Sequence, residues 1–304
     1  MLLQSNTIVV RRPRVITLLT DFGNQDAYVG IMKGVIAGIN PFANIIDICH
    51  SIHPQDIFGG AYLLYTSYKY FPRKTIHVAV IDPGVGSKRD IVCVETKDYF
   101  FLLPDNGILS FIIQNEKPKS IFRITNNKYF LPSPSNTFHG RDVFAPVAAH
   151  LSLGLKPQQL GIKINQLEQL DIPKPVSKKT GQVDGQIIYI DRFGNLITNI
   201  TKEYLVKRVG GQESEDRSQK LENRIKQRKT TLKELFSLCN TIETVIGRKK
   251  VVGLSNTYLD VNAGEPLVLF GSAGFLEISI NQGNAQKYFR VDRGNKIRVE
   301  MGSY

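Results

Sequence analysis

The sequence predicts an α/β N-terminal domain with a mainly parallel sheet, followed by a smaller all-β, barrel-like C-terminal domain. Apolar runs of strand length alternate with helical patterns over residues 15–155, which is typical of a parallel sheet covered on both faces. From Gly181 onward, short apolar runs recur between turn residues, as a small barrel or sandwich requires. Residues 171–180 combine two prolines with Ser-Lys-Lys and indicate a linker. We therefore expect domains at residues 14–170 and 181–304.

The elements of the first domain follow from apolar periodicity and from helix signals. Asn24 or Asp26 is expected to cap the first helix and Asp56 the second. Gly30, Gly34 and Gly38 share one face of the first helix, which predicts a close approach to the sheet or to a ligand. Strands are expected at residues 15–19, 44–49, 75–81, 91–95 and 99–103, and helices at 26–39, 56–70, 104–114 and 143–153.

The second domain is expected to be almost entirely β-structure, with one interruption. Residues 210–230 are rich in charge, with Leu221 and Ile225 as their only sizeable aliphatic side chains. This composition favours a mobile or partly helical insertion outside the core. The expected strands are residues 185–190, 196–200, 241–246, 266–270, 275–280 and 296–300.

Composition limits the classes of partner and the compartment. The formal charge is +12, but the basic runs near the N-terminus and over residues 202–233 are not interleaved with aromatic residues, so no nucleic acid is expected. No apolar run reaches the ~18 residues of a membrane span, and there is no signal-peptide pattern. Cys49, Cys93 and Cys239 show neither disulfide nor metal spacing. These features predict a cytoplasmic protein that does not bind membranes.

One segment, residues 81–89, combines strand-end geometry with two charged groups. An apolar strand ends in Asp82-Pro83-Gly84-Val85-Gly86, and Arg89 follows. Proline donates no hydrogen bond, and glycine allows a sharp turn or a close ligand. Ligands bind at this edge of open α/β sheets. The alternative interpretation is a tight turn with an incidental surface ion pair.

Two further loops carry polar side chains at strand ends. Asp21 with Asp26 follows the first strand, and His139 precedes Arg141 and Asp142 at a helix start. Each has a purely structural explanation as a turn residue, a cap or a satisfied loop histidine, but loops at one sheet edge converge. The sequence lacks nucleophile-elbow, P-loop and dinucleotide-binding motifs. The spacing of Asp47, His50 and His53 matches no standard metal site, and no metal is expected.

Five motifs in order resemble a known family, the S-adenosylmethionine hydroxide adenosyltransferases, which are relatives of the fluorinating and chlorinating enzymes. The resemblance covers about residues 14–200 and 240–285. Its motifs are Thr20-Asp21-Phe22-Gly23, Asp82-Pro83-Gly84-Val85-Gly86-Ser87 with Arg89, Phe138-His139-Gly140-Arg141-Asp142, Asp191-Arg192-Phe193-Gly194-Asn195 with Thr198-Asn199, and Gly271-Ser272 with Phe275-Leu276-Glu277-Ile278 and Asn281.

The resemblance implies that water attacks C5′ of S-adenosylmethionine and gives adenosine and L-methionine, with no cofactor. The catalytic residues of the family correspond to Asp82, Arg89 and His139. Asp82 would orient the water and, with His139, accept its proton, while Arg89 would fix the carboxylate and keep it ionised.

The resemblance also assigns substrate contacts. Asp21 would bind the ribose hydroxyls, and Asp191 the methionine ammonium. Ser272 would meet the methionine carboxylate, although Ala273 stands where the family has an assisting arginine. The full set of implied substrate-binding residues is Asp21, Asp26, Tyr28, Asp191, Phe193 and Asn195 (both at the adenine), Ser272 and Glu277.

Two alternatives stay open. A halide-dependent adenosyl transferase would place hydroxyl side chains in the region of Asp82, Val85 and Gly140, where this chain has a carboxylate, an aliphatic side chain and a glycine. A non-catalytic sensor of adenosine or S-adenosylmethionine would use the basic residues 202–233 as an effector arm. The resemblance further implies a homotrimer, with each site between the first domain of one subunit and the second domain of its neighbour.

Overall fold

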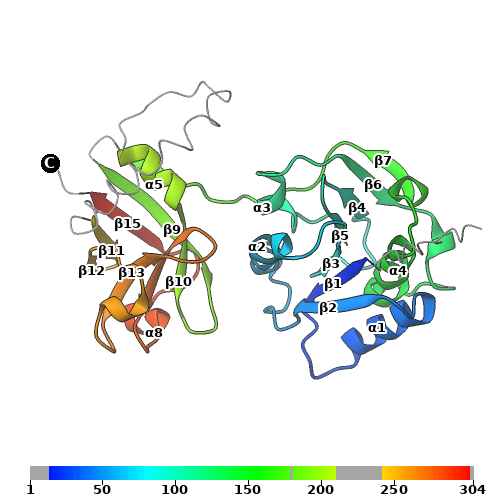
Figure 1. Ribbon diagram of the computed structural model, residues 1–304, viewed down its shortest axis with the longest axis horizontal. Helices are drawn as coiled ribbons and strands as arrows, with labels where there is room; N and C mark the ends of the chain where they lie inside the picture. The colour runs from blue at the N-terminus through cyan, green and yellow to red at the C-terminus, as the bar shows by residue number, and fades with distance from the viewer. Residues whose placement is uncertain (1–13, 179–180, 210–241, 302–304) are drawn as a thin grey trace, which may run out of the picture. The chain divides into compact units, whose positions relative to one another are not determined.

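The computed structural model describes residues 14–178, 181–209 and 242–301. They form two compact units that divide between Ile172 and Pro173 (Figure 1). The expected insertion at residues 210–230 and Cys239 lie outside the described residues. Within the described ranges, no helix has both the length and the apolar character needed to cross a membrane.

The first unit contains the expected α/β sheet, which is mixed. Seven strands lie in the order β2-β1-β3-β5-β4-β6-β7. β1 pairs in parallel with β2 and β3, and β3 with β5, whereas β4, β6 and β7 extend the sheet by antiparallel pairing. The strands are β1 (Val15–Thr20), β2 (Asn44–Cys49), β3 (Ile76–Val80), β4 (Ile91–Glu95), β5 (Phe100–Pro104), β6 (Ser120–Ile124) and β7 (Gly161–Ile164).

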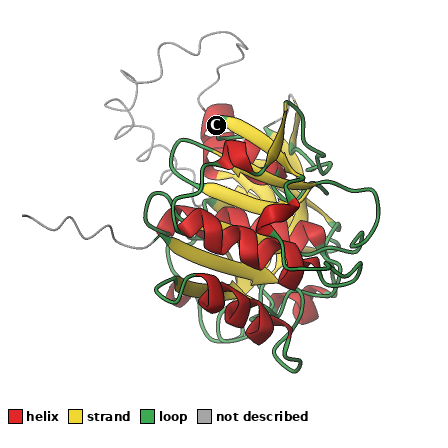
Figure 2. Cartoon of the chain, turned by 90° about the vertical axis from the view of Figure 1, so that its right-hand side faces the viewer, coloured by secondary structure: helices red, strands yellow, loops and turns green. Residues whose placement is uncertain are grey.

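Helices cover this sheet, and Figure 2 shows them lying over the strands. A single π-helical turn, η3 (Gly140–Phe144), runs directly into α4 (Ala145–Ser152). Such turns occur often at functional sites. The other helices are α1 (Tyr28–Ile39), α2 (Ile57–Ser67) and α3 (Ser110–Ile113), with short 3-10 turns η1 (Tyr68–Tyr70), η2 (Asn127–Tyr129) and η4 (Pro157–Gln159).

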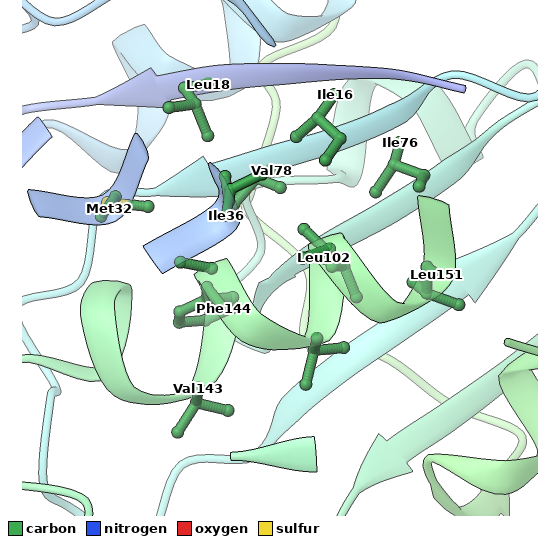
Figure 3. Packing of buried hydrophobic residues seen from close by; sticks show 14 of the residues in the cluster. Ile16, Leu18, Met32, Ile36, Ile76, Val78, Leu102, Val143, Phe144 and Leu151 are labelled. Atoms are coloured by element: carbon green, nitrogen blue, oxygen red, sulfur yellow. The ribbon is translucent and has the colours of Figure 1, made fainter. Parts of the chain in front are cut away.

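The core of the first unit lies between one sheet face and helices α1 and α4. Ile16 and Leu18 of β1 and Val78 of β3 are fully buried there against Ile36 and Phe144 of the helices (Figure 3). Alternate side chains of a strand point to opposite faces. Thr17 and Leu19 are also fully buried, so both faces of β1 are covered, as the apolar run predicts.

The start of α1 differs from the prediction. The helix begins at Tyr28, and its N-cap position, Ala27, makes no side-chain capping bond. The predicted cap by Asn24 or Asp26 is therefore wrong. The glycine stripe also differs. Gly30, Gly34 and Gly38 are exposed, and a Cβ atom added at each would meet no described atom within 4 Å. The predicted close approach to the sheet is wrong, and the alternative of a close approach to a ligand stays a prediction.

The second unit is an antiparallel, nearly closed barrel, as predicted. Its strand order is β12-β11-β15-β9-β10-β14-β13, and β8 pairs with β9. Val183, Leu196, Val268 and Ile278 belong to its fully buried core. Its elements are β8 (Val176–Lys178), β9 (Gln182–Ile190), β10 (Leu196–Thr201), α5 (Lys202–Val209), β11 (Ile242–Ile246), β12 (Lys249–Val252), η5 (Tyr258–Asp260), β13 (Pro266–Phe270), β14 (Phe275–Ile280), α8 (Ala285–Phe289) and β15 (Lys296–Met301).

The predicted cap of α2 is confirmed and gives a test of stability. Asp56 Oδ1 accepts a hydrogen bond from the backbone N–H of Gly59 at 3.0 Å. Asp56→Ala should lower the free energy of unfolding by about 1 kcal/mol, measured by urea denaturation. Asp56→Asn keeps an acceptor and serves as the control. Equal losses in both variants would contradict a capping role.

Candidate active site

Two of the predicted loops meet at neighbouring strand ends. Thr20 of β1 is in register with Val80 of β3 in a parallel pair. Asp21 therefore follows directly after one strand, and Asp82 lies two residues beyond the end of the other. The parallel register places both carboxylates at the same edge of the sheet, as predicted from the strand pattern.

Asp82 and Arg89 form a buried bidentate ion pair. Arg89 Nε donates to Asp82 Oδ1 at 2.7 Å, and Arg89 Nη2 donates to Asp82 Oδ2. The side chains of Arg89 and Asp82 are only 11% and 4% exposed. The planar guanidinium fixes both carboxylate oxygens at once. This geometry excludes the alternative of an incidental surface ion pair.

The intervening turn is fixed by backbone contacts. Val85 N–H donates to the Asp82 carbonyl at 3.2 Å, and Ser87 N–H to the Gly84 carbonyl at 3.1 Å. Gly86 has φ +76°, and an added Cβ atom would clash with the carbonyl of Asn136. Only glycine fits both constraints. The turn that carries Asp82 and Arg89 is therefore packed against the loop that leads to His139.

His139 completes the cluster through Arg89. The Nη2 of Arg89 lies 3.1 Å from His139 Nδ1. Because a guanidinium only donates, Nδ1 must accept, and a neutral ring then carries its proton on Nε2. Burial and the positive charge of Arg89 lower the pKa of His139, and the carboxylates of Asp82 and Asp142 oppose this only in part. The structure brings the three predicted catalytic residues together with a neutral histidine.

Asp142 holds the loop before His139 rather than facing the cluster. Its carboxylate accepts from Arg141 Nε at 2.6 Å and from the backbone N–H of Ser135 at 2.8 Å. Burial raises the pKa of Asp142, but the hydrogen bonds from Arg141 and Ser135 outweigh it and leave the pKa below its usual value. Asp142 and Arg141 are therefore supporting residues.

A small cavity of about 150 Å³ opens beside this cluster. Its walls include Asp82, His139 and Val85, together with Tyr28 of α1. Phe22, Tyr28 and Phe138 form an aromatic group with ring centroids 5.2–5.9 Å apart. A Cβ atom at Gly140 would lie 3.1 Å from Phe138. Sequence reasoning quoted Phe22 and Phe138 in motifs but did not assign them to the site.

Asp21 lies on the same edge, but it is not among the residues that line the cavity. Its Oδ2 accepts from the backbone N–H of Gln55 at 2.7 Å, and Gln55 has φ +67°. Among the described contacts, Oδ1 of Asp21 and the second lone pair of its Oδ2 stay available to accept hydrogen bonds from a ligand. Asp26 is exposed in the loop before α1, away from the cavity walls.

A buried histidine that sequence reasoning did not assign supports the Asp21 loop. His50 is 6% exposed. Its Nδ1 lies 2.8 Å from Thr20 Oγ1, and its Nε2 lies 3.1 Å from Asp47 Oδ1. The His50 carbonyl accepts from Gly23 N–H at 2.7 Å. The hydrogen bonds of His50 with Thr20 and Gly23 hold the residues on both sides of Asp21.

In the second unit, Asp191 organises the turn between β9 and β10. Its Oδ1 accepts from the backbone N–H groups of Phe193 and Asn195, both at 2.9 Å, and its Oδ2 accepts from Asn195 Nδ2 at 2.9 Å. This turn leaves Phe193 72% exposed and Asn195 7% exposed. An exposed phenyl ring beside a fixed amide is suited to stacking on and hydrogen bonding a planar heterocycle.

The turn between β13 and β14, and β14 itself, carry the other predicted residues of the second unit. Ser272 is exposed in it. Glu277 is 8% exposed, and its Oε1 accepts from Tyr258 at 2.7 Å and from Ser279 at 2.8 Å. Burial raises the pKa of Tyr258, and its hydrogen bond to Glu277 and the nearby charge of Asp191 add to the shift. Tyr258 was not predicted as a site residue.

Comparisons with known proteins show the family of this chain. The chain matches the models of the SAM hydroxide adenosyltransferase N-terminal domain over residues 16–161 and C-terminal domain over residues 185–237 and 225–298. It is similar to an (R)-S-adenosyl-L-methionine hydrolase of Methanocaldococcus jannaschii, with 37% identity over 94% of this chain and 95% of that protein. A Thermus thermophilus protein of the same name is 32% identical over 94% of this chain and 99% of its own.

The chain is also similar to a fluorinase and to a protein of known crystal structure. A fluorinase of Actinoplanes is 27% identical over 94% of this chain and 97% of its own. The crystal structure of an uncharacterized conserved protein from Thermotoga maritima aligns with a TM-score of 0.80 and 35% identity, covering 94% of this chain and 99% of that one. The chain belongs to the SAM hydroxide adenosyltransferase family.

Proposed function

We propose that this chain is an enzyme that hydrolyses S-adenosyl-L-methionine to adenosine and L-methionine. The observation that carries the proposal is the Asp82–Arg89–His139 cluster beside the cavity of the first unit. Relatives named (R)-S-adenosyl-L-methionine hydrolase, at 30–37% identity, support it.

The reaction is an in-line substitution at C5′. The water oxygen forms a bond to C5′ while the C5′–S bond breaks. The electron pair of the C5′–S bond goes to sulfur, and methionine leaves as a neutral thioether. The water proton must be accepted. Arg89 already occupies Nδ1 of His139, so Asp82 is the proton acceptor, and the Nε2–H of His139 can hydrogen-bond the attacking oxygen. Positioning the water supplies much of the acceleration.

Arg89 holds the carboxylate of Asp82, the proposed proton acceptor, in place. Its guanidinium stabilises the negative charge of Asp82 and uses one lone pair on each oxygen. A carboxylate has about four acceptor sites, so each oxygen can still accept a hydrogen bond from water. Val85 forms an apolar wall of the cavity, which limits the number of competing waters.

The remaining residues bind the substrate in this proposal. Asp21 accepts hydrogen bonds from the two ribose hydroxyls, with Asp26 and Tyr28 beside it. Asp191 and Ser272 bind the ammonium and the carboxylate of methionine, and Phe193 and Asn195 bind the adenine. Glu277 supports this end through Tyr258. No cofactor takes part, and we place the reaction in the cytoplasm, where unpaired cysteines such as Cys49 and Cys93 persist.

We further propose a homotrimer in which the first unit of one subunit meets the second unit of its neighbour. The cavity of about 150 Å³ is smaller than the roughly 300–1,000 Å³ of typical small-molecule sites. The first unit alone would therefore leave most of the substrate uncovered. The exposed Phe193 ring in the second unit is a side chain available to cover it.

The two alternative functions are less well supported. A halide would enter a cavity walled by the Asp82 carboxylate and would be repelled, and the fluorinases are 22–27% identical to this chain. A sensor has no use for a buried carboxylate, guanidinium and neutral imidazole in mutual contact. Both alternatives predict that substrate is not hydrolysed.

The decisive experiment uses ¹⁸O-labelled water. Each sulfonium epimer of S-adenosylmethionine is incubated with the purified protein, with and without chloride or fluoride. We expect adenosine labelled at the 5′-oxygen, with no halogenated nucleoside. Substrate recovered unchanged after hours would reject the enzyme, and product formed only with halide would favour the halogenating alternative.

The role of Asp82 can be tested by one substitution. Asp82→Asn keeps the shape but removes the proton acceptor, so kcat should fall by roughly 10²–10⁴-fold, with KM changed little. Asp98→Asn is the matched control, because Asp98 pairs with the exposed Arg73. Full turnover by Asp82→Asn, measured by adenosine release, would remove this assignment.

The shared site can be tested by mixing inactive subunits. Asp82→Ala and Asp191→Ala are each expected to be inactive. When the two are coexpressed, about a quarter of the interfaces combine two intact halves, so about a quarter of wild-type activity should return. Coexpressed Asp82→Ala and Arg89→Ala, both altered in the first unit, form the control and should stay inactive. No recovery in the first mixture would contradict a site shared between subunits.

A further inference from the structure

A cavity in the second unit contains none of the residues assigned to hydrolysis. It has a volume of about 700 Å³ and lies among β8, β9, β11 and β15. Val176, Asp184, Arg298 and Val245 lie side by side in register on these four strands. Their neighbours in sequence, such as Val183, Ile246 and Val299, belong to the barrel core. The cavity therefore lies on the outer face of the barrel.

The walls of this cavity are strongly basic. Lys174, Lys178, Lys296 and Arg298 line it together with a single acidic residue, Asp184, which leaves an excess of three positive charges. The residues come from separate segments, namely the stretch before β8, β8 itself, β9 and β15. Cations that converge on one concave site concentrate their field there.

Asp184 holds two of these cations in place. Its carboxylate accepts from Lys178 Nζ at 2.9 Å, from Arg298 Nε at 2.9 Å and from Gln182 Nε2 at 2.8 Å. The hydrogen bonds from Lys178, Arg298 and Gln182 hold the pKa of Asp184 far below its usual value. Arg298 Nη1 also lies 3.8 Å from Glu300 Oε1. A guanidinium and an ammonium each have more donors than these contacts use, so both side chains keep donors for another anion.

Two further cations have no such partner. Neither Lys174 nor Lys296 makes an ion pair with any residue in the part of the chain that the structure describes. Both are exposed. An anion in the cavity would supply the counter-charge that the protein does not.

The cavity also has an apolar side. Val176 is 59% exposed, and Val245 lines the same space. The volume falls within the roughly 300–1,000 Å³ of small-molecule sites. A ligand that fits would combine a multiply charged anionic group with a short apolar body.

We propose that this cavity binds a small phosphomonoester. Its phosphate would contact Arg298, Lys178 and Lys296, and its organic part would lie on Val176 and Val245. Guanidinium and ammonium groups together are the usual partners of a phosphate dianion. The cations gather in one cavity and do not form a stripe, which favours a small ligand over a nucleic-acid strand.

The test is a titration of the full-length protein with phenyl phosphate at constant ionic strength. Methyl NMR signals of Val176 and Val245 report binding without any assay of hydrolysis. We expect saturable shifts of these signals, and the same shifts from inorganic phosphate only at higher concentration. Shifts that stay linear with concentration would overturn the proposal, as would tighter binding of inorganic phosphate than of phenyl phosphate.

Charge variants show whether the named residues bind the phosphate. Lys296→Gln should weaken binding about fivefold, as expected for one partly screened charge contact, and Lys296→Glu should weaken it further. Lys287→Gln, an exposed lysine of α8 outside the cavity, is the matched control. Equal affinities in Lys296→Gln and Lys287→Gln would overturn the assignment. Tighter binding of a short single-stranded oligonucleotide than of phenyl phosphate would replace the small ligand with a nucleic acid.

Discussion

The first unit depends on a charge that the fold has removed from water. Asp82 is 4% exposed and is stabilised by the two hydrogen bonds from Arg89. Removing one partner of a buried ion pair costs roughly 3–5 kcal/mol, because the other charge is left without compensation. The turn, the neighbouring loop and the histidine are all arranged around this pair. Asn106 adds a hydrogen bond to the carbonyl of Ile81, directly before Asp82, at 2.9 Å.

The other loops at this edge are held by polar groups that do not face the cavity. His50 hydrogen-bonds Thr20, and Asp142 links the start of η3 to Ser135. Each is buried, so its hydrogen bonds are strengthened by the low local dielectric. Rigid support of this kind keeps reacting groups within the narrow tolerances that catalysis needs. The strands of the sheet fix the first residues of each loop, and these buried hydrogen bonds fix the position of the residues that follow.

Much of this arrangement could be predicted from the sequence. The features that could not be predicted depend on contacts between residues far apart in the chain or on interrupted apolar patterns. The strand alternation predicted the sheet, and the motifs predicted that Asp82, Arg89 and His139 meet. Strands β6 and β7 were missed because residues such as Arg123 and Lys163 interrupt their apolar pattern. The bond between Thr20 and His50 joins residues 30 positions apart and leaves no local signal. That His139 accepts a hydrogen bond at Nδ1, and so carries its proton on Nε2, follows only from the position of Arg89.

Val85 and Gly86 are neighbours with very different tolerance to change. Gly86 is fixed by its left-handed backbone and by the carbonyl of Asn136, whereas Val85 contributes a side chain to the cavity wall. A substitution at Val85 would therefore change the cavity wall, while the adjacent glycine preserves the shape of the turn. In this chain, which is also 27% identical to a fluorinase, the shape of the turn and the lining of the cavity therefore rest on different residues. The lining of the cavity can therefore change without a loss of the fold.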